Sequence, residues 1–282
     1  MIETNLIQIN TENHIKEFEI YYNPSVKSKA YIIYIHGGGL IYGSKSDLPD
    51  FHIEKITSAG YKIISLEYPL APNKKIDFIL DDLVDSINQI VTNPKDFGND
   101  DLDYFIWGRS AGAYLGLLAV SKYDLKKSPA GLISYYGYGF FDNDWDKIPS
   151  KYYNKFPKVS IKDLPISDVN TDLSASLEDK YHLYVYARQN GKWSSMFYKG
   201  REKYFYRDFS LRTVPNFSMP IFACHAINDT DVPFSEFNKI KSTYKVDSFI
   251  APVDVHDFDR DVSSPFTKKL LDKTIKFLDT NL

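Results

Sequence analysis

The chain has 282 residues, 43% of them hydrophobic, and a formal net charge of −3 from 34 basic and 37 acidic residues. This length favours a single domain with an insertion, because α/β folds of this size commonly form one core. The charges are nearly balanced, and no long basic run could follow a phosphate backbone. Nucleic acid is therefore not expected as a partner.

Cysteine usage and the N-terminal sequence bear on the compartment. Cys224 is the only cysteine, so the chain can form neither an intrachain disulfide nor a cysteine-based zinc cluster. The N-terminus lacks the basic stretch followed by an apolar one that is typical of a signal peptide. No segment approaches the about 20 apolar residues of a membrane-spanning helix. We expect a cytoplasmic protein without membrane insertion.

Strand and helix patterns alternate along most of the chain. Segments 6–9 and 16–21 alternate apolar with polar residues, which predicts an antiparallel hairpin at a sheet edge. Buried strands are predicted at 31–35, 61–66, 103–107, 131–136, 219–225 and 247–251, and helices at 48–59, 76–91, 113–120, from about 235, and at 265–278. This order predicts an α/β fold with a mainly parallel central sheet flanked by helices.

The alternation is interrupted between the fourth and fifth of these buried strands. Residues 137–215 are rich in aromatic side chains with charged residues between them. A loop of this length without structure of its own is unusual in a compact domain, so we expect short helices, including one around 177–189. We interpret this stretch as a cap inserted into a single domain, 1–282, and expect most of its aromatic residues to pack cap against core.

Ser110 lies between two glycines at the junction of a predicted strand and a predicted helix, in Gly108-Arg109-Ser110-Ala111-Gly112. A strand that turns directly into a helix strains the backbone at the junction, and glycines leave the space that side chains would fill. Free N–H groups at the helix start would stabilise negative charge developing near the serine. The pattern predicts a nucleophilic serine, although such a motif alone also occurs by chance.

A second motif lies upstream, where the strand 31–35 ends in His36-Gly37-Gly38-Gly39. In hydrolases with a serine turn of this kind, such a loop presents backbone N–H groups to an oxyanion. Together the two motifs resemble the α/β-hydrolase fold, in its esterase and lipase branch with the hormone-sensitive-lipase-like and acetyl-esterase-like families. The resemblance extends from about Tyr31 to the C-terminus and implies an enzyme that needs no cofactor.

A serine hydroxyl needs a base to accept its proton and a third group to orient that base. In the α/β-hydrolase fold the acid follows the strand after the cap, and the histidine follows the last strand. Asp229 and His256 lie at these places. Their surroundings, Asp229-Thr230-Asp231-Val232-Pro233 and His256-Asp257-Phe258, resemble the Asp-x-x-Val-Pro and His-x-Phe segments of acetyl-esterase-like relatives. The resemblance implies a catalytic set of Ser110, Asp229 and His256.

Alternatives exist for the acid and for the base. Asp231 is the other candidate acid, and Asp229 could instead be a turn residue that accepts local backbone hydrogen bonds. His225 competes as the base, although it precedes the acid in the chain. His36 is expected to brace its glycine loop rather than to transfer protons. No H-E-x-x-H or similar pattern occurs, and we predict no metal.

The same resemblance implies that Gly38, Gly39 and Ala111 donate their N–H groups to the oxyanion. Loss of one such donor typically lowers turnover by about 10²–10³. The chain also departs from the pattern of those relatives, with Arg109 in place of a common aspartate, Leu40 in place of an aromatic residue, and Pro69 in place of an arginine. Kinship therefore does not identify the substrate.

The leading hypothesis is a carboxylic-ester hydrolase that acts through an acyl-enzyme on Ser110. The bulky cap and the lack of an apolar lipid-docking segment favour small soluble esters with short acyl groups. One alternative is a serine peptidase of the same fold, for which the chain shows no repeat-built accessory domain. Another is a catalytically silent binding protein, although such proteins usually lose a member of the catalytic set and none is missing here.

Overall fold

The computed structural model describes residues 2–11, 14–164 and 177–282. Its strands are β1 (Glu3–Asn10), β2 (Ile15–Tyr22), β3 (Ala30–Ile35), β4 (Tyr61–Leu66), β5 (Tyr104–Arg109), β6 (Gly131–Tyr135), β7 (Ile221–Ala226) and β8 (Val246–Ala251). Its α-helices are α1 (Asp50–Ser58), α2 (Ile76–Thr92), α3 (Ala111–Lys122), α4 (Leu177–Gln189), α5 (Trp193–Phe197), α6 (Glu202–Asp208), α7 (Phe234–Thr243) and α8 (Pro265–Thr280). The predicted elements outside the interrupted stretch are therefore all present, with ends shifted by a few residues.

The strands form one eight-stranded sheet in the order β1-β2-β4-β3-β5-β6-β7-β8. β1 and β2 form the predicted antiparallel hairpin at one edge, and β2 joins β4 antiparallel. All other neighbours pair in parallel, which confirms the predicted mainly parallel sheet. The central strands are buried along their whole length because helices cover both faces.

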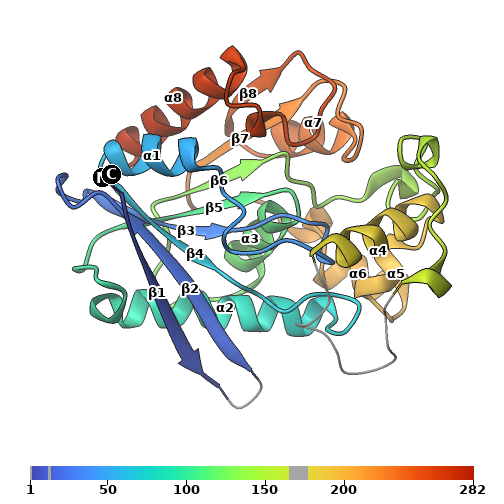
Figure 1. Ribbon diagram of the computed structural model, residues 1–282, viewed down its shortest axis with the longest axis horizontal. Coiled ribbons are helices and arrows are strands. Elements are labelled where there is room, and N and C mark those ends of the chain that lie inside the picture. Colours follow the sequence, from blue (N-terminus) through green and yellow to red (C-terminus); the bar gives the residue numbers. More distant parts are fainter. Residues whose placement is uncertain (1, 12–13, 165–176) are drawn as a thin grey trace.

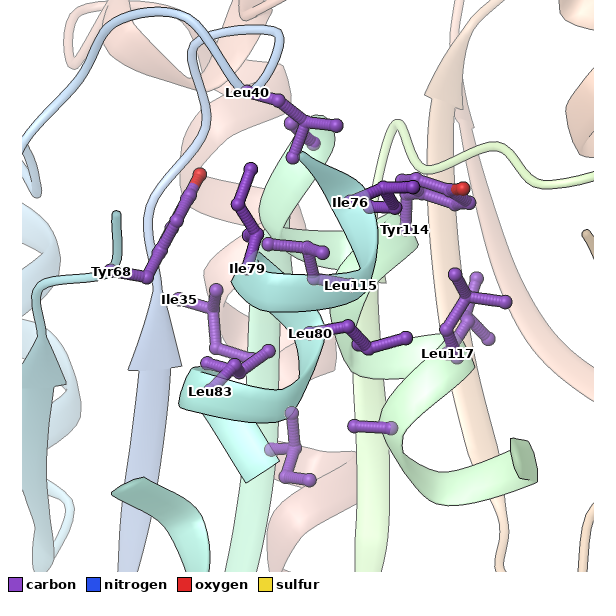
Figure 2. Close-up of a cluster of buried hydrophobic side chains, with 14 of the residues drawn as sticks. Ile35, Leu40, Tyr68, Ile76, Ile79, Leu80, Leu83, Tyr114, Leu115 and Leu117 are labelled. Atoms are coloured by element: carbon purple, nitrogen blue, oxygen red, sulfur yellow. The ribbon is translucent and has the colours of Figure 1, made fainter. Parts of the chain in front are cut away.

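Two hydrophobic clusters, one on each face, hold the helices to the sheet. α2 and α3 cover one face, and α1 and α8 cover the other (Figure 1). Figure 2 shows part of the first cluster, in which apolar side chains of α2 meet those of α3 and β3, among them Ile35, Ile79, Leu80, Leu83 and Leu115. The helical spacing of the apolar residues in α2 thus matches the face that it buries.

The segment between β6 and β7, here called the cap segment (136–220), adds no strand to the sheet among its described residues. It holds α4, α5 and α6, and α4 has the bounds predicted from the sequence. In Figure 1 these helices lie beyond the end of the sheet to which the arrowheads of β5 and β6 point. Residues 165–176 of the predicted cap lie outside the described residues.

The aromatic side chains of the cap segment are mostly buried. Trp145, Trp193, Phe197 and Phe205 are each at most 7% exposed, and their rings pack against one another in tilted or edge-on pairs. These contacts lie within the cap segment. The expected packing of cap against core is seen at Trp145, which donates to Glu236, and at Trp193, which donates to the Gly39 oxygen. Across the described ranges, no helix combines the length and apolar character needed to cross a bilayer.

Candidate active site

Ser110 lies between the end of β5 and the start of α3, with φ 51° and ψ −115°. A positive φ is unusual for a residue with a side chain and marks a strained turn. Backbone atoms approach both flanking glycines too closely for a side chain to fit. A Cβ on Gly108 would lie 2.3 Å from the nitrogen of Ala113, and one on Gly112 would lie 2.1 Å from the oxygen of Ile35. The turn thus has the geometry that the sequence predicts.

Ser110, His256 and Asp229 are joined by hydrogen bonds. The His256 Nε2 lies 2.8 Å from the Ser110 Oγ, and the His256 Nδ1 lies 2.7 Å from the Asp229 Oδ2. In the neutral ring, an Nδ1–H that donates to the carboxylate leaves Nε2 free to accept the serine proton. The three residues follow β5, β7 and β8, so they meet at the carboxyl end of the parallel sheet.

Asp229 acts both as a turn residue and as a partner of the histidine. Its Oδ1 accepts the backbone N–H groups of Asp231, at 2.8 Å, and Val232, at 2.9 Å. Its Oδ2 is the atom that faces His256. Burial would raise the pKa of Asp229, but the adjacent His256 outweighs it and holds that pKa below its usual value. The two interpretations of this residue are therefore compatible.

Asp231, the other candidate acid, binds the cap segment instead of His256. Its carboxylate accepts hydroxyl hydrogen bonds from Tyr184, at 2.7 Å, and Tyr153, at 3.0 Å. The Arg188 guanidinium pairs with it at 3.2 Å. The geometry therefore favours Asp229 as the group that orients the histidine.

His225, the other candidate base, contacts Asp229 rather than Ser110. Its ring is fully buried, and its Nε2 lies 3.1 Å from the carbonyl oxygen of Val232 and 3.3 Å from the Asp229 Oδ2. Burial lowers the pKa of His225, so the ring is neutral and Nε2–H is the donor. This histidine supports the acid from the side and has no described hydrogen bond to the serine.

The Asp229–His256 pair sets the basicity of the site. Burial alone would lower the pKa of His256, but the negative charge and hydrogen bond of Asp229 raise it to about 9. The ring is therefore a stronger base than an isolated imidazole, and it needs a higher pH to become neutral.

His36 braces the glycine loop, as its place in the sequence suggests. Its Nδ1 lies 2.8 Å from the oxygen of Gly37, and its Nε2 lies 2.9 Å from the Glu67 Oε1. Burial would lower the pKa of His36, but Glu67 raises it. A charged ring can donate from both nitrogens, which fixes the start of the loop.

The next residues of the glycine loop turn sharply. Gly38 and Gly39 have φ values of 104° and 59°, and the Gly38 oxygen accepts the N–H groups of Ile41 and Tyr42, each at 3.0 Å. In the part of the chain that is described, no hydrogen bond uses the N–H of Gly38 or Gly39. Ala111 is the first residue of α3, where an N–H has no acceptor within the helix.

A buried ionic network behind the site is not evident from the sequence. Arg109 pairs with Asp259 at 3.0 Å, and the His52 Nε2 lies 2.9 Å from the same carboxylate. Asp259 follows His256 by three positions, so the network ties the turn at Ser110 to the histidine loop. Arg109 itself is noticeable as a departure from the family pattern, but nothing in the sequence indicates its partners.

In the described structure, the side chains that commonly bind metal ions do not cluster into a site. Over residues 2–11, 14–164 and 177–282, no group of three or more His, Cys, Asp or Glu side chains is placed to hold a metal ion.

Comparison with known proteins places the chain in a family. Residues 18–244 match the family model BD-FAE. Among solved structures, a protein of unknown function from Staphylococcus aureus is 27% identical with a TM-score of 0.80, and the match covers 99% of this chain and 100% of the other. An α/β-hydrolase superfamily protein from Enterococcus faecalis is 29% identical with a TM-score of 0.77, covering 97% and 98%. Esterase structures from Rhizomucor miehei share the fold at 16% identity and a TM-score of 0.71, covering 99% and 84%.

Proposed function

The chain belongs to the BD-FAE family, and on that premise we propose that it is a carboxylic-ester hydrolase with Ser110 as nucleophile, His256 as general base and Asp229 as the group that orients the base. The observation that carries the proposal is the pair of hydrogen bonds, 2.8 Å and 2.7 Å long, that link these three side chains. The esterases from Rhizomucor miehei support the reaction type, because they share this fold.

In the proposed reaction the Ser110 Oγ attacks the ester carbonyl carbon while its proton passes to the His256 Nε2. The oxyanion that forms accepts the N–H groups of Gly38, Gly39 and Ala111. The protonated His256 then donates its proton to the departing alkoxide, which leaves as the alcohol. Water, deprotonated by His256, then attacks the acyl carbon. The bond between that carbon and the Ser110 Oγ breaks, the Oγ takes the proton back from His256, and the carboxylic acid leaves.

We propose small soluble esters with short acyl groups as substrates, and a single domain whose cap is the insertion 137–215. The cap segment comes close to the glycine loop, because a Cβ on Gly39 would lie 2.2 Å from the Tyr184 ring. Tyr184 is itself buried and bound to Asp231. Such close packing restricts the room for a long acyl chain.

Replacing Ser110 by alanine tests the proposal. Hydrolysis of p-nitrophenyl acetate should fall by about 10⁴ or more. The members of a catalytic set act as a unit, so loss of the nucleophile alone removes most of the rate enhancement that they provide together. Circular dichroism and melting temperature should stay close to those of the wild type, since only a hydroxyl is removed. Unchanged hydrolysis by a folded Ser110→Ala protein would refute the assignment. Faster cleavage of peptides than of esters by the wild type would favour a peptidase.

A further inference from the structure

Each of the three carbonyl groups of the glycine loop accepts at least one hydrogen bond. The Gly37 oxygen accepts from His36, and the Gly38 oxygen accepts from the amides of Ile41 and Tyr42. The Gly39 oxygen accepts from the indole Nε1–H of Trp193, at 2.8 Å. His36, Ile41 and Tyr42 belong to the loop itself, and the Tyr68 hydroxyl also reaches the Gly37 oxygen, at 3.4 Å. Trp193 lies in the cap segment, 154 positions further along the chain than Gly39.

The Gly39 N–H lies in the same peptide plane as the Gly38 carbonyl, whose partners Ile41 and Tyr42 follow Gly39 in the chain. The bond to the Gly39 carbonyl therefore acts on this N–H through the Gly39 torsions. Each peptide unit is planar, so fixing the Gly38 and Gly39 carbonyls fixes both peptide planes that flank the Gly39 Cα. Glycine has wide conformational freedom, and without the second restraint this residue could leave its φ of 59°. A hydrogen bond from the cap therefore adds a second restraint to the turn that orients the Gly39 N–H.

Trp193 is itself held in place. Its side chain is 1% exposed, and its ring lies 5.3 Å from that of Trp145 and 5.5 Å from that of Tyr138. The Arg188 guanidinium lies over the same ring at 5.2 Å, and it also pairs with Asp231. A donor that is immobilised in this way loses little further freedom when it binds the loop.

From this geometry we infer that Trp193 is a positioning residue of the cap segment that orients the oxyanion loop through the Gly39 carbonyl. The inference rests on the proposed function, since it gives Gly39 a role in stabilising the transition state. The cap is then part of the catalytic apparatus as well as its cover.

The test compares Trp193→Phe with Trp145→Phe. Each change deletes one buried indole N–H from the same aromatic cluster, but the Trp145 Nε1–H donates to Glu236, at 3.1 Å, and not to the glycine loop. In Trp193→Phe, kcat for p-nitrophenyl acetate should fall about 10-fold with KM nearly unchanged, which is less than the loss of a whole oxyanion donor. In Trp145→Phe, kcat should stay within about 2-fold of the wild type after matching for folded protein.

A second measurement separates positioning from general loosening of the fold. A short trifluoromethyl ketone forms a hemiketal oxyanion on the serine, so its affinity reports on the oxyanion donors. Its inhibition constant should weaken in Trp193→Phe in parallel with kcat/KM, and stay near the wild-type value in Trp145→Phe. Equal losses in the two variants, or a Trp193→Phe loss confined to KM, would overturn the inference.

If Trp193→Phe does not fold, β-(3-benzothienyl)alanine at position 193 replaces the N–H by sulfur in a ring of the same shape, and the same outcomes apply. A wild type that neither hydrolyses esters nor binds the ketone would refute the proposed function. A wild type that does both, with Trp193 variants indistinguishable from it, would refute only the role of Trp193.

Discussion

Asp229 uses its two carboxylate oxygens for different tasks. One holds the turn by accepting the amides of Asp231 and Val232, and the other binds His256. The short turn that fixes the carboxylate also fixes the direction in which it faces the histidine. Asp229 fits both a turn and the proposed catalytic acid, which is why the sequence alone left both interpretations open.

The pair formed by Asp229 and His256 predicts a pH profile. Only the neutral His256 can accept the serine proton, and Asp229 raises the pKa of His256 to about 9. The kcat/KM of the wild type should therefore rise with pH and reach half its maximum near pH 9, because kcat/KM reports on the free enzyme. Asp229→Asn removes the charge that raises this pKa, so its rising limb should move to lower pH while its maximum falls. A limb at the same pH in both proteins would contradict the assignment.

The two histidines near Asp229 should respond differently to substitution. His256→Ala removes the base and should lower kcat by about 10⁴ or more. His225→Ala removes a weaker contact, 3.3 Å from Asp229; a hydrogen bond of about 1 kcal/mol corresponds to less than about 10-fold in rate. Measuring kcat for both variants at matched folding decides the matter, and the reverse order would make His225 the base.

At the scale of elements, the turn from β5 into α3 could be recognised from the sequence because its signal is local. Small residues at fixed spacing, between an apolar strand and an apolar helix, imply a sharp turn in any chain. A helix around 177–189 was expected for a different reason, because a long loop without structure is unusual in a compact domain. The bond from Trp193 to Gly39 and the pairing of Arg109 with Asp259 join residues far apart in the chain. Neither has a local pattern, so only the folded arrangement reveals them.

The glycines of α3 provide a test of the turn. In Gly112→Ala the new Cβ would meet the backbone oxygen of Ile35 at 2.1 Å, and the strain should cost about 3 kcal/mol or more. For a chain of this size that corresponds to a drop of roughly 6–12 °C in melting temperature. Thermal unfolding of the purified variant measures this drop.

Gly116→Ala is the matched control, because its Cβ would meet a side-chain methyl of Ile106 at 3.1 Å. Better helix propensity offsets that contact, so its stability should change by no more than about 1 kcal/mol. Equal destabilisation by the two substitutions would show that the turn does not require a glycine at Gly112.

At the scale of the whole molecule, the sheet brings together residues that the sequence separates, and the cap segment covers them from one end. The order of strands and helices was sufficient to predict the sheet and its parallel core. It was not sufficient to predict which residues of the cap bind the core, because the aromatic and charged residues of the cap are not spaced as in a regular helix or strand. Asp231 was the other candidate acid from the sequence. Its carboxylate instead binds three side chains of the cap, by hydrogen bonds from Tyr153 and Tyr184 and an ion pair with Arg188.

The close fit between cap and glycine loop predicts the preferred length of the acyl group. Hydrolysis of p-nitrophenyl esters should be fastest between acetyl and butyryl, because Tyr184 occupies the space beside Gly39. Steady-state kcat/KM along the series from acetate to palmitate measures this preference. A higher value for the palmitate ester would contradict a closed site for short acyl groups.

Covalent labelling with a fluorophosphonate tests whether Ser110 is an activated nucleophile, because this reagent reacts with activated serine hydroxyls. The wild-type protein is incubated with a fluorophosphonate, and its intact mass and the modified peptide are determined by mass spectrometry. We expect one adduct per chain, located on Ser110, and none in Ser110→Ala or in heat-denatured protein. An unmodified wild type, or an adduct on another residue that persists in Ser110→Ala, would contradict it.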